Sequence, residues 1–359
     1  MLIGWVWMKT RGQPHGFFYA PSKPLLTMTD IRPVSSIEHL NFAWFAMVMG
    51  LCGLSLAWMR AVPHWAGAAQ VSMGVGVLAA WVFLALLLAT VWRVLRHPAA
   101  VLADVRDPLR QVFVAALPSS LVLIATVAFV HGFDGFWTDA AWMLGSAALL
   151  LVTTVVVQRW FQPGLVAAQF WPAMTPALFI PVVGNVLPAL AGVGLGHPVW
   201  AAAQYGIAAV LWPVALTLVL VRIGKVGLWP QRMLPATFIT IAPPSVLALS
   251  GVQLGAPDVL VHMLWGVALL FTGVSMTVFK RSLAQPFGMS FWGMSFPLAA
   301  SAALSLHLAP AHGLAQLLAL AWLAGATAVI AGLLLATAWG LLRGRLLLPE
   351  PGVAPSPSA

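Results

Sequence analysis

The long uncharged stretches of this sequence offer one kind of chemistry, hydrogen bonding by hydroxyls and by backbone groups at helix breaks. Ser119 follows Pro118, and Ser245 follows Pro244. A proline removes one backbone donor and frees a carbonyl, while hydroxyls and exposed N–H groups can donate to anions. This predicts a weakly selective anion pathway, because no fixed charge takes part. Packing of small residues between helices is the alternative interpretation for each serine. The residues predicted to line or kink the pathway are Gly50, Gly53, Pro118, Pro188, Pro243, Pro244, Pro297, Ser119, Ser245 and Ser295.

These residues need membrane-spanning helices to position them. Of the 359 residues, 61% are hydrophobic and 7% are charged, too few charges to cover a soluble domain. Eight uncharged stretches of spanning length follow one another, and two of them are long enough for two helices each. The sequence therefore predicts an all-α polytopic membrane protein with ten transmembrane helices.

The predicted helices alternate in character along the chain. Odd spans contain prolines or, in the first span, glycines, at an offset that varies from span to span. Even spans are mostly unbroken and rich in Leu, Val and Ala. Broken backbone is tolerated where it faces protein or a wet cavity. We therefore expect the odd helices to line a central pore inside a ring of even helices.

Charge sets the expected orientation and the domain limits. All Lys and Arg except Arg60 fall in the N-terminal segment, the even loops and the C-terminal segment, which predicts that both termini are cytoplasmic. The net charge of +9 then faces anionic lipid and does not indicate nucleic acid. We expect a cytoplasmic extension over residues 1–35, the transmembrane domain over 36–346 and a disordered tail over 347–359.

Enzyme chemistry is absent from the pattern. No nucleophile–base pair, phosphate loop or metal cluster is present, so we expect no catalytic residues, no metal and no cofactor. Cys52 is the only cysteine and is interpreted as a packing residue. Arg106 and Arg110 in the second loop are either topology charges with local ion pairs or part of a cytoplasmic vestibule that concentrates anions.

Phe296, directly before Pro297, could close an apolar pore by dewetting or could be a core residue. Around it the sequence resembles the tellurite-resistance/dicarboxylate transporter family, most closely its TehA branch, the prokaryotic relative of the plant guard-cell slow anion channel. The resemblance spans about residues 38–346 and leaves out both tails. The segments that carry it are Phe45–Gly53 with Ala57 and Trp58, His97–Pro108, Thr175 and Pro176 with Pro181 and Asn185, Gln285–Phe296 and Leu306–Leu308.

This resemblance implies five helical hairpins with quasi-fivefold symmetry, a homotrimer with one pore per protomer, and Phe296 as the pore gate. Pro297 departs from the familiar bacterial member, which has glycine there. We expect a gated, weakly selective channel for small inorganic or organic anions in a bacterial inner membrane. The alternative is a proton-linked carrier for C4-dicarboxylates such as malate, or for oxyanions such as tellurite or sulfite. No helix interior holds the arginine that would pair with a dicarboxylate, which favours the channel.

Overall fold

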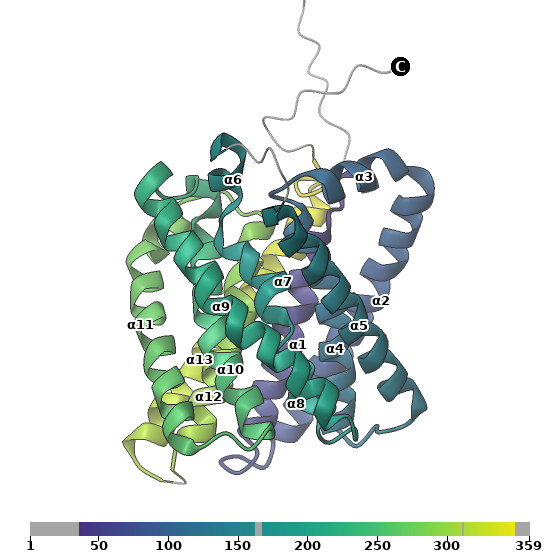
Figure 1. Ribbon diagram of the computed structural model, residues 1–359. Helices are drawn as coiled ribbons and strands as arrows, with labels where there is room; N and C mark the ends of the chain where they lie inside the picture. The colour runs from purple at the N-terminus through teal and green to yellow at the C-terminus, as the bar shows by residue number, and fades with distance from the viewer. Residues whose placement is uncertain (1–35, 162–166, 311, 349–359) are drawn as a thin grey trace, which may run out of the picture. The chain divides into compact units, whose positions relative to one another are not determined.

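The computed structural model describes residues 36–161, 167–310 and 312–348, and within them the chain is helical throughout (Figure 1). The predicted extension 1–35 and nearly all of the predicted tail 347–359 lie outside the described residues. The α-helices are α1 Ala46–Arg60, α2 Ala68–Arg96, α3 Pro98–Arg106, α4 Ala116–Val130, α5 Phe136–Gln158, α6 Ala167–Ala173, α7 Phe179–Gly184, α8 Ala189–Gly192, α9 Pro198–Val226, α10 Ala242–Gln253, α11 Asp258–Leu283, α12 Ser295–Leu308 and α13 Leu314–Leu342.

The described chain also contains seven 3-10 helices of 3–11 residues. They are η1 Ile37–His39, η2 Phe42–Phe45, η3 Gln111–Ala115, η4 Arg159–Phe161, η5 Pro176–Leu178, η6 Gln231–Ile241 and η7 Met289–Met294. Five of them, η2, η3, η5, η6 and η7, run directly into α1, α4, α7, α10 and α12. A 3-10 helix followed by an α-helix therefore opens every odd span.

Nine helical segments in the described residues are long and apolar enough to cross a membrane, and a tenth apolar segment, Pro176–Gly192, is shorter. The tenth is broken into η5, α7 and α8, with Pro176 at the start of η5, Pro181 inside α7 and Pro188 at the N-cap of α8. The multi-pass membrane architecture predicted from the sequence is confirmed at this level.

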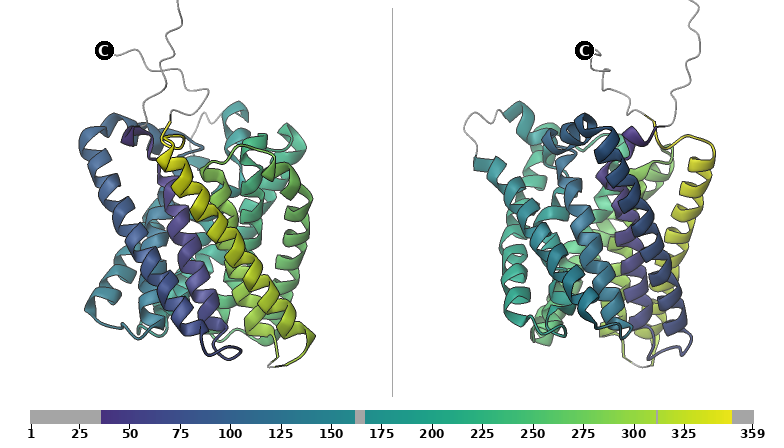
Figure 2. Two further views of the ribbon diagram at one scale, coloured as in Figure 1. Left: turned by 180° about the vertical axis from the view of Figure 1, so that it is seen from behind. Right: turned by 90° about the vertical axis from the view of Figure 1, so that its right-hand side faces the viewer.

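Burial separates the segments into two sets. In the four long odd segments, 61–94% of the apolar window is buried inside the protein, against 17–33% in α2, α5, α9, α11 and α13. We call the odd segments the inner segments and these five helices the outer helices. Each inner segment packs against the outer helix that follows it, and contacts run from α1 to α4, α7 and α8, α10, α12 and back to α1. The views of Figure 2 show α13 on the outside of this arrangement.

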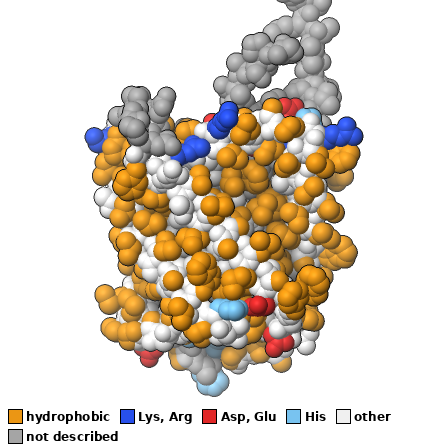
Figure 3. All heavy atoms as spheres, turned by 45° about the vertical axis from the view of Figure 1, so that its right-hand side comes forward, with side chains coloured by type: hydrophobic (Ala, Val, Ile, Leu, Met, Phe, Trp, Pro, Cys, Tyr) orange, Lys and Arg blue, Asp and Glu red, His pale blue; other side chains and the backbone are white. Residues whose placement is uncertain are grey.

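The outer helices present an apolar surface to the surroundings. Side chains such as Trp81, Leu88 and Leu151 are more than half exposed, and Figure 3 shows hydrophobic side chains covering the middle of one face. Lys and Arg gather at one end, which we call the basic end. Among the described Lys and Arg, only Arg60 lies at the opposite end.

Indole N–H groups tie the two sets of helices together. Trp265 of α11 donates to Ser305 of α12 at 3.3 Å, and Trp322 of α13 donates to Ser301 of α12 at 2.9 Å. An N–H group left unpaired in an apolar environment is costly, so each of these bonds also fixes how an outer helix sits on an inner one.

Candidate functional site

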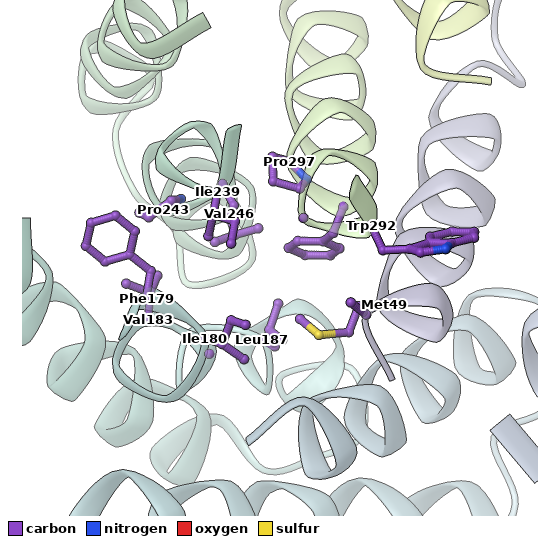
Figure 4. A pocket seen from close by; sticks show the side chains of 15 residues that line it. Met49, Phe179, Ile180, Val183, Leu187, Ile239, Pro243, Val246, Trp292 and Pro297 are labelled. Carbon is purple, nitrogen blue, oxygen red and sulfur yellow. The ribbon is translucent and has the colours of Figure 1, made fainter. Parts of the chain in front are cut away.

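An apolar hollow of about 60 Å³ lies among four of the five inner segments (Figure 4). One water molecule needs roughly 10–15 Å³ of such volume, so a small ion would fit. The lining residues are all apolar or glycine: Ala46 and Met49; Phe179, Ile180, Val183, Gly184 and Leu187; Ile239, Ala242, Pro243 and Val246; Trp292, Gly293, Phe296 and Pro297. Nothing in this lining replaces the hydration shell of an ion.

Proline position explains how Phe296 reaches the hollow. Pro118, Pro181, Pro244 and Pro297 are each the third residue of their α-helix, counted from the switch out of the 3-10 helix. The expectation of a variable offset is therefore wrong for these four segments. A proline leaves the carbonyl four residues earlier without its α-helical donor. The i→i+3 pattern of a 3-10 helix supplies a donor from the residue before the proline.

The residue before that proline faces the hollow in three of the four helices. It is Leu117 in α4, Ile180 in α7, Pro243 in α10 and Phe296 in α12, and all but Leu117 line the hollow. Phe296 carries the largest side chain of the four. One backbone feature, repeated on separate inner segments, thus directs three side chains to the same space.

Two predicted glycines lie behind Phe296 rather than in the lining. A methyl group on Gly53 would stand 2.9 Å from Cδ2 of Phe296, and one on Gly50 would stand 2.2 Å from Oγ of Ser295. Real Cβ atoms do not approach other atoms so closely. Gly50 and Gly53 therefore allow α1 and α12 to pack tightly, with the Phe296 ring lying on Gly53.

The three predicted serines are buried, and none of them lines the hollow. Ser245 donates to the Ile241 carbonyl at 2.8 Å, and Ser295 donates to the Trp292 carbonyl at 2.7 Å. Ser119 Oγ has no hydrogen-bond partner among the described residues. A methyl group on Gly184 would stand 3.2 Å from it, so this hydroxyl faces α7.

The remaining predicted prolines have separate positions. Pro243 and Pro297 line the hollow, while the Pro188 carbonyl accepts from the Trp142 indole at 3.1 Å. Pro118 lies against α5, where its carbonyl would be 3.1 Å from a methyl group on Gly145. Pro244 is buried beside Pro243.

The basic end holds a buried ion-pair cluster. Asp104 of α3 forms an ion pair with Arg93 of α2 at 2.8 Å and accepts a hydrogen bond from Arg110 at 3.1 Å. Arg93 also donates to the Glu38 carbonyl. The side chains of Arg93 and Asp104 are 3% and 2% exposed. Arg106 is exposed, and its carbonyl accepts from Arg159. Arg110 thus takes part in fixing α3.

At the opposite end, a histidine joins an inner segment to an outer helix. Ser72 of α2 donates to the Ser55 carbonyl at 2.7 Å, and its oxygen lies 3.0 Å from Nε2 of His131. Burial lowers the pKa of His131, which favours the neutral imidazole that donates to this oxygen.

Most of the lining was not predicted from the sequence. Met49, Ile180, Ile239 and Trp292 look like ordinary core residues in an apolar chain. Ile180 had a usable signal, since it precedes Pro181 as Phe296 precedes Pro297. The other three depend on which helix face turns inward, and only tertiary packing sets that.

The architecture defines a class: a multi-pass membrane protein whose inner segments surround an apolar hollow. An apolar passage stops ions by dewetting when it is narrow. The described residues hold no group of three or more His, Cys, Asp or Glu that could bind a metal ion.

The comparisons with known proteins give the family. Residues 39–338 match the family model SLAC1, described as voltage-dependent anion channel, and the chain belongs to this family. It is therefore a membrane protein of an anion channel family and not an enzyme. The chain is 23% identical to a tellurite resistance protein TehA homolog of Haemophilus influenzae, over 73% of this chain and 79% of that protein. It is 24% identical to an uncharacterized transporter of Methanocaldococcus jannaschii, over 76% and 84%.

Proposed function

We propose that this protein is a gated channel for small anions and that the Phe296 ring is its gate. The observation that carries the proposal is the position of Phe296 in the apolar hollow among the inner segments. We propose that this hollow is the constriction of the pathway. A hydrated anion cannot enter the hollow without losing water, and no lining group compensates for that loss. Movement of one ring would change the width of the constriction.

The arrangement of the helices supports a pathway at this place. Five inner segments, each followed by its outer helix, form five hairpins, and we propose that they repeat with quasi-fivefold symmetry around the pathway. The 3-10 turn and the proline recur at one register in four of them. Recurring breaks directed at one axis are expected of a conduction path, because irregular backbone in a membrane needs protein or water around it.

The charge distribution favours anions over cations, with selection among anions set by how easily each loses water. The inner segments hold no Asp, Glu or Lys, and their charged residues Arg60 and Arg232 lie at segment ends. A cation pathway would need carboxylates or a carbonyl filter. We propose that selection follows the cost of dehydration.

A proton-linked carrier for dicarboxylates or oxyanions is the competing function. No arginine at mid-depth in the described inner segments could pair with a dicarboxylate. We therefore place the carrier second, and the experiment below includes it as an outcome.

The setting proposed for the channel follows the charge pattern and the family. The basic end would face the cytoplasm of a bacterium across its inner membrane, with both termini on that side, and Arg106 and Arg110 would border the cytoplasmic vestibule. A homotrimer with one pathway in each protomer is proposed from the family resemblance.

The test is anion current through wild-type protein and Phe296→Ala in planar bilayers under asymmetric chloride. We expect a large increase in current that reverses near the chloride potential, because the smaller side chain widens the constriction. Phe271→Ala on outer helix α11 is the matched control and should leave the current unchanged. Silent bilayers with both proteins, together with pH-dependent malate or sulfite uptake in proteoliposomes, would support the carrier instead.

A further inference from the structure

We propose that Arg60, oriented by His307, is an anion-capture site at the outer mouth of the pathway. This inference rests on the proposed function, and it adds a binding site outside the gate. The ligand class is a small monovalent anion such as a halide or nitrate.

The position of the pair follows from helix geometry. Met49 and Phe296 line the hollow, and Arg60 and His307 each stand eleven residues further along the same helices. Eleven residues are close to three α-helical turns, so each residue returns to the face of the one that lines the hollow, about 16 Å away along the helix. On both helices, the face that borders the hollow therefore continues to the end opposite the basic end, where Arg60 and His307 lie.

The side chains meet where these lines end. Nη1 of Arg60 lies 3.3 Å from Nδ1 of His307. Arginine can only donate, so His307 accepts through an unprotonated Nδ1, and the pair carries the single charge of Arg60. His307 is exposed and Arg60 is partly exposed, which leaves the pair accessible from solution.

Arg60 is also unusual in its charge environment. It is the only Lys or Arg at the opposite end among the described residues, against the distribution that sets membrane orientation. In the described part of the chain, no carboxylate lies within ion-pair distance of it, whereas Arg93 and Arg110 are paired with Asp104. A guanidinium that is held by a neutral histidine keeps its remaining donors for an anion.

Neighbouring groups at this end are few. Of the elements packed against α12, α1 contributes Arg60, and α11 contributes Asp258 and His262 at its first turns. The segments α10 and α13 contribute no charged side chain at this end. Among the described residues, Arg60 is therefore the one guanidinium beside α12 at this end, and Asp258 opposes it. The same end also carries His64 in the loop after Arg60 and the carboxylates Asp134 and Asp139 near the start of α5.

The simpler role of a basic residue in the last turn of α1 is to stabilise the helix C-terminus. That role would affect folding, but it would not change how conduction depends on anion concentration on one side. A capture site raises the local anion concentration, so it lowers the concentration that half-saturates the current from that side.

The experiment replaces Arg60 with a cysteine whose charge can be set by chemical modification, in the Phe296→Ala variant that is expected to conduct. Cys52 is buried, so Phe296→Ala/Arg60→Cys presents one accessible thiol among the described residues. Current is recorded while the chloride concentration is varied on the side of the membrane that Arg60 faces. The series is measured before and after modification by a cationic or an anionic methanethiosulfonate reagent. We expect the half-saturating chloride concentration to rise about fivefold on substitution, to return after the cationic reagent and to rise further after the anionic one.

Controls separate this inference from the proposed function. Phe296→Ala with native Cys52 should respond to neither reagent, and neither should Phe296→Ala/Val199→Cys, whose thiol would be exposed at the first turn of outer helix α9. Phe296→Ala/His307→Cys should show a lower half-saturating concentration after the cationic reagent, and it serves if Arg60→Cys does not fold. An unchanged half-saturating concentration in conducting variants overturns the capture site alone. A silent Phe296→Ala parent overturns the channel and the capture site together.

Discussion

The inner segments and the outer helices solve the same problem of crossing a membrane in different ways. The outer helices are unbroken runs of 23–29 residues, long enough to cross about 30 Å of hydrocarbon with an apolar surface outward. The inner segments switch from 3-10 to α-helix, carry prolines and are mostly buried. The outer set isolates the inner set from lipid, and this isolation allows an irregular backbone.

Hydroxyl groups donate to carbonyls close to the breaks of the inner segments. In the inner segments, Ser295, Ser245 and Ser120 donate to nearby carbonyls, and Thr153 of α5 donates to the Pro181 carbonyl at 2.6 Å. Hydroxyl groups thus support the broken backbone from within the protein. The comparison predicts that the same substitution, made in an inner segment and in an outer helix, changes stability or anion current differently.

The largest loss of stability is expected at a buried charge on an outer helix, since the other outer helices present mainly apolar side chains. Arg93 is a buried charge on α2, and Asp104→Asn would leave it without its carboxylate partner. Breaking a buried pair in this way costs about 3 kcal/mol of unfolding free energy. Chemical unfolding in detergent measures this loss, and Arg93→Met/Asp104→Leu should recover most of it. If Asp104→Asn unfolds at the wild-type denaturant concentration, the cluster does not hold α3 in place.

A glycine-to-alanine pair compares the two sets directly. Gly50→Ala places a methyl group 2.2 Å from Ser295 Oγ, whereas nothing lies within 4 Å of a methyl group at Gly325 in α13. We expect Gly50→Ala to destabilise the protein by about 2 kcal/mol through overpacking. Gly325→Ala should stabilise it by about 0.5 kcal/mol because alanine favours the helix. Thermal unfolding of both variants decides the matter, and equal shifts would contradict the tight contact between α1 and α12.

Particular residues show what the sequence predicts and where it stops. The alternation of broken and unbroken spans and the position of Phe296 before Pro297 can be read directly, because prolines and charges act locally. The common register of the four prolines becomes visible only when it is counted from the 3-10 switch, which charged residues do not mark. Ser245 and Ser295 were predicted to serve the pathway, and in the structure their hydroxyls donate to the Ile241 and Trp292 carbonyls of their own segments. Met49 and Trp292 depend on which face turns inward.

The proline before the gate gives a functional comparison with a smaller effect on stability. Pro297→Ala restores a backbone donor at the 3-10 switch of α12, and Pro213→Ala does the same inside outer helix α9. In α12 the added hydrogen bond favours extension of the α-helix through Phe296, which turns the ring relative to the hollow. We expect Pro297→Ala to raise the basal anion current severalfold while changing stability by about 1 kcal/mol or less. Bilayer recordings should show no change for Pro213→Ala, and a matching increase there would mean that proline position in α12 does not set the gate.

The smallest expected effect separates two adjacent serines of α4. Ser120 Oγ donates to the Ala116 carbonyl at 2.7 Å and lies 3.1 Å from the Phe45 carbonyl, whereas the Ser119 hydroxyl is buried without a partner in the described chain. Removing a hydrogen bond between membrane helices costs about 0.6 kcal/mol, so Ser120→Ala should lower the unfolding free energy by this amount. Ser119→Ala should leave stability unchanged or raise it slightly, because a buried unpaired hydroxyl is itself unfavourable. Current through both variants, each combined with Phe296→Ala, then tests the prediction that Ser119 lines the pathway. A selective loss of current in Ser119→Ala, at unchanged stability, would mean that this hydroxyl turns toward the pathway when the gate is open.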